Sequence, residues 1–112
     1  MFNGGHVVIY SNDAEKDRRF FADVLGLSHV NVGDGWLIFA LPPSEVAFHP
    51  HKTSTAHDFY FMCDDIQTVC QEFDAREVAY SDPVDEGWGI VSSFVLPGGG
   101  KVGFYQPRHV RP

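Results

Sequence analysis

The chain has 112 residues, of which 44% are hydrophobic, so it is long enough and apolar enough for one folded domain, which we expect to span residues 1–112. Its formal net charge is −7, which argues against binding to nucleic acids or to anionic membrane surfaces. The basic tail formed by Arg108, His109 and Arg111 is too short to change this. The chain has only two cysteines, which suggests a reducing compartment. Its first residues lack the pattern of a signal peptide, and no apolar run is long enough to span a membrane. We therefore expect a cytoplasmic protein.

The sequence contains a weak internal repeat. When it is shifted by 52 positions, several features of the first half fall on matching features of the second. The coinciding pairs are Asp13 with Asp65, Phe21 with Phe73, and Gly35-Trp36 with Gly87-Trp88. The repeat predicts two tandem units, one over about residues 1–50 and one over about residues 56–112.

The first half reads as a strand, a helix and three further strands. We expect Asn12 to cap the helix, with Glu15 completing a capping box, and Gly26 to end it. The expected strands are His6–Tyr10, Leu27–Val32, Trp36–Leu41 and Glu45–His49.

The second half repeats this order. Asp64 or Asp65 is expected to cap a helix whose apolar stripe consists of Ile66, Val69, Cys70 and Phe73. The expected strands are Phe59–Cys63, Val78–Ser81, Trp88–Leu96 and Lys101–Gln106. One helix per four strands predicts an α+β fold of two tandem βαβββ modules. A ferredoxin-like α+β barrel is the competing fold, and the repeated Gly-Trp pair favours the tandem modules.

Several motifs resemble those of a known family. His6, Tyr10–Asp13, Phe20-Phe21 and Val24–Leu27 are similar to the opening of glyoxalase and bleomycin-resistance proteins, and Cys63–Ile66 and Pro97–Lys101 resemble parts of their second module. The sequence thus resembles the vicinal oxygen chelate superfamily. The resemblance implies a U-shaped half-barrel cleft and a homodimer. It also implies either a divalent metal held at four strand positions, as in the metalloenzyme members, or a metal-free cleft that sequesters a flat or hydrophobic compound.

The four metal positions implied by the resemblance are only half filled. The first falls on His6 and the third on Asp58, both of which can bind a divalent metal. The second falls on Ala47 or Phe48, and the fourth on Gly103, where the metalloenzymes carry Glu. We therefore expect no metal and no other cofactor. A metal bound through His49 or His57 remains the alternative.

The remaining polar and aromatic residues predict a binding cleft. Strand alternation turns Asp58 and Tyr60 toward the cleft, with Phe59 and Phe61 on the helix side. The candidate ligand-binding residues are His6, Tyr10, Trp36, Asp58, Tyr60, Trp88 and Tyr105. They favour a small hydrophobic or aromatic ligand, and a cationic one would suit both the rings and the net charge.

Three functions remain open. The sequence favours a small-molecule binding protein of the glyoxalase/bleomycin-resistance type with an incomplete metal site. The alternatives are a metal-dependent lyase, isomerase or dioxygenase of the same superfamily with an altered ligand set, and an assembly subunit without a ligand. No catalytic residue can be assigned.

Glu77 follows the second helix where the family typically has Gly. A left-handed conformation is unfavourable for Glu, so we expect this helix end either to differ in geometry or to be strained.

Overall fold

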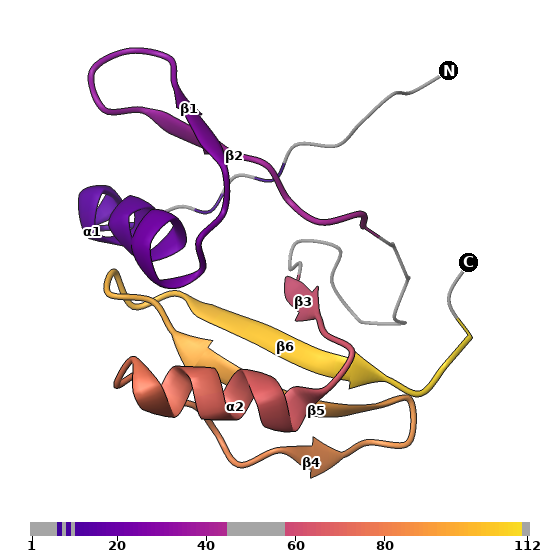
Figure 1. Ribbon diagram of the computed structural model, residues 1–112. Helices are drawn as coiled ribbons and strands as arrows, with labels where there is room; N and C mark the ends of the chain where they lie inside the picture. Colours follow the sequence, from indigo (N-terminus) through magenta and orange to yellow (C-terminus); the bar gives the residue numbers. More distant parts are fainter. Residues whose placement is uncertain (1–6, 8, 10, 45–57, 111–112) are drawn as a thin grey trace, which may run out of the picture.

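The computed structural model describes residues 7, 9, 11–44 and 58–110. It contains a two-stranded sheet in the first half and a four-stranded sheet in the second (Figure 1). The first and fourth strands expected in the first half, His6–Tyr10 and Glu45–His49, lie outside the described residues, except for Val7 and Ile9, which are not in a strand. None of the helices in the described part of the chain is long and apolar enough to cross a membrane.

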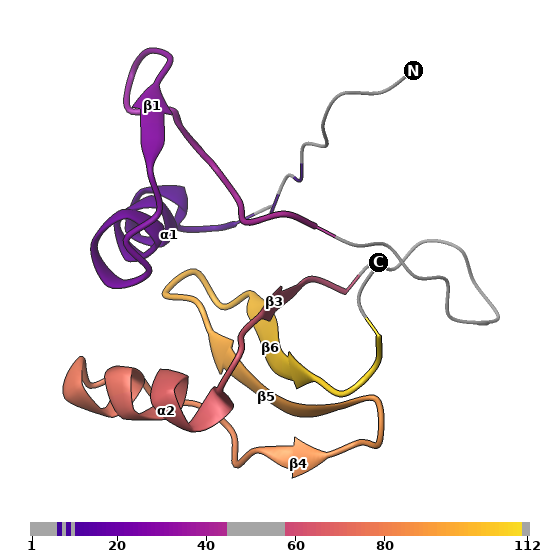
Figure 2. The same cartoon turned by 45° about the vertical axis from the view of Figure 1, so that its right-hand side comes forward.

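The first half has a helical segment followed by a hairpin. Helix α1 spans Ala14–Arg19 and continues directly as a π-helical turn, η1, over Phe20–Val24. Strand β1, His29–Asn31, pairs antiparallel with β2, Leu37–Phe39. Both strands lie within the ranges that the sequence predicts. The hairpin projects away from the four-stranded sheet (Figures 1 and 2).

Helix α1 begins one residue later than expected. Its N-cap is Asp13, whose Oδ1 accepts a hydrogen bond from the backbone N–H of Lys16 at 3.3 Å. The backbone N–H of Asp13 in turn donates to Ser11 Oγ at 3.0 Å. The predicted capping box of Asn12 and Glu15 is therefore wrong, because the side chain of Asp13 already accepts from the first turn.

The π-helical turn lets two consecutive aromatic rings pack inward. The backbone N–H of Leu25 donates to the carbonyl of Phe20, five residues earlier, at 3.1 Å. The ring of Phe20 lies 5.5 Å from that of Phe94, and the ring of Phe21 lies 6.0 Å from that of Phe61. Both contacts join the first half to the sheet of the second.

The second half has the complete βαβββ order that the repeat predicts. Its elements are β3 (Tyr60–Met62), α2 (Ile66–Ala75), β4 (Val84–Asp85), β5 (Gly89–Val95) and β6 (Lys101–Pro107). The strand order is β3-β6-β5-β4, with β3 parallel to β6 and the other pairs antiparallel. Asp65 caps α2 by accepting from the N–H of Gln67 at 3.0 Å, which confirms one of the two expected caps.

The strand expected at Val78–Ser81 is wrong; β4 lies at Val84–Asp85 instead. Ser81 does approach β5, since its N–H donates to the carbonyl of Ser93 at 2.9 Å. The N–H of Ser93, however, donates to the Ser81 hydroxyl at 3.0 Å. The Ser81 hydroxyl oxygen thus takes the place of a backbone carbonyl as the acceptor from Ser93. The regular backbone pairing with β5 begins only at Val84.

The core lies on the helix-covered face of the four-stranded sheet. The predicted stripe of α2 supplies Ile66, Cys70 and Phe73 as buried residues, and Val69 packs against them. The sheet contributes Phe94, Leu96, Val102 and Phe104. Phe59 and Phe61 pack on this side, as strand alternation predicts, so their neighbour Tyr60 points to the opposite face.

A buried carboxylate joins the two halves. Asp17 of α1 accepts a hydrogen bond at Oδ1 from the backbone N–H of Gly98, in the β5–β6 turn, at 2.8 Å. A side chain at Gly98 would overlap Ser11 Oγ and Asp17. Glycine is therefore required here, because the turn approaches the start of α1 too closely for any Cβ.

The two helical segments end with the same backbone geometry on different residues. Gly26 after η1 has φ 66°, and Glu77 after α2 has φ 58°. At the end of α2 the N–H of Glu77 donates to the carbonyl of Asp74, and the N–H of Val78 donates to that of Phe73. This pair of bonds is a Schellman motif, which forces the residue at Glu77 into the left-handed region. The expected strain at this helix end is confirmed.

Candidate functional site

Three aromatic rings meet on the face of the four-stranded sheet opposite the helices. We call Tyr60, Trp88 and Tyr105 the aromatic cluster. The ring centroids lie 6.0 Å apart for Tyr60 and Trp88, 5.8 Å for Tyr60 and Tyr105, and 5.1 Å for Trp88 and Tyr105. The interplanar angles of the three pairs are 82°, 83° and 69°, which is the edge-to-face arrangement that aromatic quadrupoles favour. The rings come from β3, from the loop between β4 and β5, and from β6.

Two glycines form the floor beneath these rings. Tyr60 pairs with Gly103 across the parallel β3–β6 ladder, and a Cβ at Gly103 would overlap the Tyr60 ring. A Cβ at Gly89 would lie only 2.8 Å from Cδ2 of Tyr105. Gly103 is the position where the resemblance implies the metal-binding Glu of the metalloenzymes. With Tyr60 in this conformation, no such side chain fits at that position.

The cluster is open to solvent at its rim and closed at its base. Tyr60 and Trp88 are 38% and 44% exposed, whereas Tyr105 is 9% exposed. A molecule arriving from solvent would therefore contact the first two rings, with the third fixed behind them. Exposed aromatic rings over a backbone floor give a mainly apolar surface on which a planar group can pack.

Two carboxylates lie near the Tyr60 hydroxyl. Burial raises the pKa of Tyr60, and the negative charges of Asp58 and Glu86 raise it further. Asp58 was predicted at this site from strand alternation. Glu86 was missed, although it precedes Trp88 by two residues just as Asp58 precedes Tyr60. The repeated acid-x-aromatic spacing is the signal that could have identified it.

The end of β6 and the residues after it contact the back of the cluster. The Tyr105 hydroxyl lies 3.1 Å from Nε2 of His109, and Nδ1 of His109 lies 3.0 Å from the carbonyl of Val110. The backbone N–H of Arg108 donates to the carbonyl of Trp88 at 3.0 Å. The sequence shows these residues only as a short basic tail, because no local pattern indicates that the tail folds back toward Trp88.

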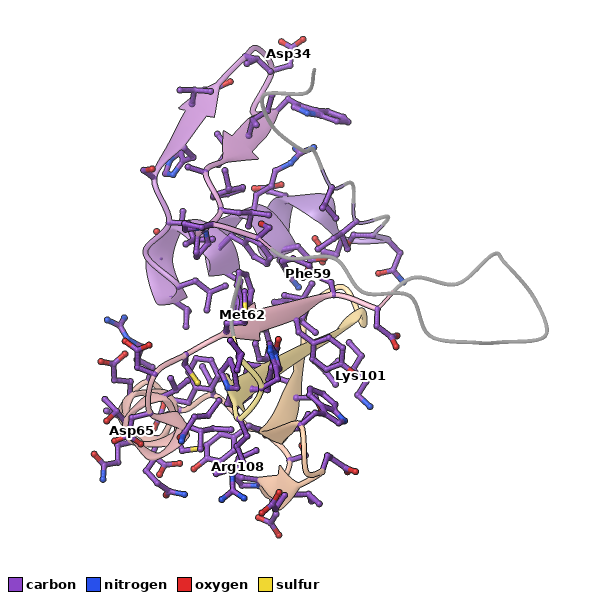
Figure 3. The ribbon with its side chains drawn as sticks, turned by 90° about the vertical axis from the view of Figure 1, so that its right-hand side faces the viewer. Asp34, Phe59, Met62, Asp65, Lys101 and Arg108 are labelled. Atoms are coloured by element: carbon purple, nitrogen blue, oxygen red, sulfur yellow. The ribbon has the colours of Figure 1, made fainter. Side chains whose placement is uncertain are left out.

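Trp36 lies apart from the cluster. It is 56% exposed, and the guanidinium carbon of Arg18 lies 4.9 Å from the centre of its ring. Arg18 also donates to the carbonyl of Gly35 at 3.2 Å. Figure 3 shows Asp34, at the tip of this hairpin, and Arg108, beside Trp88, at opposite ends of the molecule.

The structure thus brings together four of the seven residues expected in the cleft. Tyr60, Trp88 and Tyr105 contact one another, and Asp58 lies close enough to affect the pKa of Tyr60. The other expected cleft residues are Trp36, which lies apart, and His6 and Tyr10, which are outside the described residues.

The described ranges contain no group of three or more His, Cys, Asp or Glu side chains that could hold a metal ion. Of the four implied ligand positions, Asp58 and Gly103 are described, and Tyr60 covers the second of these. His6 and the Ala47–Phe48 position lie outside the described residues, as do the alternative ligands His49 and His57. Of the two described positions, Gly103 therefore does not fit the family's metal centre, whereas Asp58 could supply a ligand.

The two thiols are core groups. Burial raises the pKa of Cys63 to about 11 and also raises that of Cys70. Cys63 donates to the carbonyl of Tyr105 at 3.4 Å, from the helix side of the sheet. Both are free cysteines, and a thiol with a raised pKa is a poor nucleophile near neutral pH.

Comparison with known proteins gives structural neighbours only. No family model matches the sequence, and no curated protein matches it. Among solved structures, the antibiotic binding protein TnmS3 from Streptomyces sp. CB03234 matches with a TM-score of 0.68 and 23% identity, covering 96% of this chain and 99% of that one.

Two further structures show the same likeness. A glyoxalase/bleomycin resistance protein from Streptomyces sp. CB03234 matches with a TM-score of 0.63 and 23% identity, covering 88% and 95% of the two chains. A lactoylglutathione lyase from Agrobacterium tumefaciens matches with a TM-score of 0.68 and 17% identity, covering 90% of each. The chain therefore has the α+β fold of glyoxalase and bleomycin-resistance proteins, the fold that its resemblance to the vicinal oxygen chelate superfamily predicted.

Proposed function

We propose that this protein binds a flat, hydrophobic or aromatic small molecule at the aromatic cluster, and that binding needs no metal. The observation that carries the proposal is the packing of Tyr60 over Gly103. A ring fills the position from which the metalloenzyme members would supply a ligand, so the surface offers stacking in place of metal chelation. The fold shared with an antibiotic binding protein is consistent with this function.

The charge around the rings favours a cationic ligand. Asp58 and Glu86 both raise the pKa of Tyr60, so negative charge lies beside an exposed ring. A cation over an aromatic face gains attraction from the ring quadrupole as well as from the carboxylates. Each stacked ring contributes about 1 kcal/mol, so the two exposed rings together raise the affinity by about 30-fold.

The experiment uses two probes with the same ring system. Acridine at pH 8 is neutral, and N-methylacridinium carries a fixed positive charge. We expect N-methylacridinium to bind more tightly, and Asp58→Asn and Glu86→Gln each to weaken it by about three-fold while leaving acridine unchanged. Asp34→Asn, at the remote hairpin tip, removes one negative charge as the matched control.

Two results would contradict the proposal. If neither probe binds the wild-type protein at millimolar concentration, the aromatic cluster is not a stacking site. If Asp34→Asn weakens N-methylacridinium as much as Asp58→Asn does, the effect comes from the net charge of −7 and not from carboxylates beside the rings.

The metal-free part of the proposal has its own test. Purified protein dialysed against a chelator, then against buffer, is expected to contain far less than one metal ion per chain. Stoichiometric nickel, zinc, manganese or iron would favour the metal-dependent lyase, isomerase or dioxygenase alternative, with His49 or His57 as substitute ligands.

We also propose that the two halves form one domain and that the chain is a homodimer. The Asp17–Gly98 hydrogen bond and the contact between Phe20 and Phe94 join the halves. Val30 and Val32, on and beside β1, are exposed, and a second copy would bury such apolar surface. Sedimentation at micromolar concentration is expected to give a dimer, and a clean monomer would contradict this.

A further inference from the structure

The residues that follow β6 contact both the backbone of the loop that carries Trp88 and the ring of Tyr105. We propose that Arg108 and His109 are positioning residues of the aromatic cluster: Arg108 holds Trp88 through its loop, and His109 holds Tyr105. The positioning role itself does not depend on the proposed function; only the expected effect of these residues on ligand binding rests on it.

Arg108 makes two hydrogen bonds to β4 and the β4–β5 loop that carries Trp88. Its backbone N–H donates to the carbonyl of Trp88 at 3.0 Å, and its guanidinium donates to Oδ2 of Asp85 at 2.7 Å. The other oxygen of Asp85 accepts from the N–H of Gly87 at 2.9 Å. One carboxylate therefore bridges the guanidinium to the backbone immediately before Trp88.

The loop turns at a glycine that has no side chain to hold it. Gly87 has φ 85°, in the left-handed region that glycine adopts without a Cβ penalty. The backbone N–H of Glu86 donates to the carbonyl of Gly89 at 2.9 Å, which closes the loop but leaves the Trp88 side chain unfixed by that bond. The two contacts with Arg108 therefore fix the backbone that presents the Trp88 ring to Tyr60 and Tyr105.

His109 acts on the buried ring of the cluster. Its Nε2 lies 3.1 Å from the Tyr105 hydroxyl, and its Nδ1 lies 3.0 Å from the carbonyl of Val110. A carbonyl can only accept, so Nδ1 carries the hydrogen and, in the neutral ring, Nε2 accepts from Tyr105. The imidazole ring also lies 5.9 Å from the Tyr105 ring, tilted by 34°. Tyr105 is thereby held against Gly89, beneath the edge of Trp88.

The test needs no ligand in its first arm. In a Trp36→Phe background, Trp88 is the only tryptophan of the chain, so near-ultraviolet circular dichroism and fluorescence anisotropy report on its immobilisation. Arg108→Gln is expected to lower both signals, and Arg108→Lys, which keeps the positive charge, to restore part of them. Arg19→Gln is the matched control, because Arg19 pairs with Glu15 at 3.6 Å on an exposed helix surface.

A double-variant comparison tests whether Arg108 acts through Asp85. Asp85→Asn and Arg108→Gln should each lower the Trp88 signals, and the two together should lower them no further than one alone. His109→Phe is expected to alter the tyrosine contribution to the same spectra while leaving the Arg108 effects in place. Additive effects of Asp85→Asn and Arg108→Gln would overturn the proposed chain of contacts.

The second arm measures binding of N-methylacridinium. We expect Arg108→Gln to raise its Kd by about five-fold through a faster off-rate, with no more loss of thermal stability than Arg19→Gln causes. Trp88 signals unchanged in Arg108→Gln would overturn the inference whether or not the probe binds. If the signals fall but the wild type binds no probe, the positioning role stands and the proposed function fails.

Discussion

The two tryptophans of the repeat occupy equivalent places in the sequence and different places in the molecule. Trp36 stacks on Arg18 at the edge of the first half, whereas Trp88 joins Tyr60 and Tyr105 on the open face of the second. A ring with a cation over it is shielded on one face, whereas a ring among other rings extends an apolar surface. The difference teaches that an internal repeat fixes the order of elements but not the use of each side chain.

The two halves also use different residues at equivalent helix ends. The first half uses Gly26 for the left-handed residue and the second uses Glu77. The halves also differ in regularity, because the first helix contains a π-helical turn and the second does not.

The largest expected effect is at the junction. Asp17→Ala leaves the half-buried N–H of Gly98 without its acceptor, so we expect the free energy of unfolding to fall by about 2 kcal/mol. Urea denaturation measures it. Asp23→Ala, an exposed aspartate in η1, is the control, and an equal loss in both variants would mean that the Gly98 contact does not stabilise the junction.

Opposite substitutions at the two helix ends should have opposite effects. Glu77→Gly removes left-handed strain and is expected to raise the free energy of unfolding by about 1 kcal/mol, whereas Gly26→Ala should lower it by a similar amount. A Cβ at Gly26 would meet nothing within 4 Å, so its cost would be conformational alone. Thermal or urea unfolding of the pair checks this, and a loss of stability in Glu77→Gly would contradict the comparison.

The binding surface should depend on the second half only. Tyr60→Ala is expected to weaken N-methylacridinium by about five-fold, because one stacking ring is lost. Tyr60→Phe keeps the ring and should bind nearly as well as the wild type. Gly103→Ala should behave like Tyr60→Ala, since its Cβ displaces the Tyr60 ring. Calorimetric titration measures all three, and normal binding by Gly103→Ala would argue against this floor.

The smallest expected effect is at the other tryptophan. Arg18→Gln removes the cation over Trp36 and is expected to cost about 0.5 kcal/mol of stability, without changing the affinity for either probe. A loss of probe binding in this variant would place Trp36 in the ligand site after all.

Local sequence signals predicted much of this architecture. The repeat aligns Asp13 with Asp65, and both are helix caps, although the local pattern predicted Asn12 as the first cap. Alternation placed Phe59 and Phe61 toward the helix and Tyr60 away from it, because a strand exposes successive side chains on opposite faces.

The features that the sequence did not predict depend on contacts between residues far apart in the chain. The π-helical turn forms where Phe20 and Phe21 both reach apolar partners far along the chain. Trp36 lies beside Arg18 and apart from the cluster, and no pattern around Trp36 indicates this. Glu86 and His109 belong to a loop and a tail, whose positions follow from the fold and not from periodicity.

The central claim is that a planar ligand binds beside Trp88 and away from Trp36. In a titration of 15N-labelled protein with N-methylacridinium, each tryptophan gives its own indole N–H signal, and Trp36→Phe assigns them. We expect the Trp88 signal to shift and saturate with the calorimetric Kd while the Trp36 signal stays in place. Equal shifts of both signals, or a shift of the Trp36 signal alone, would contradict the account.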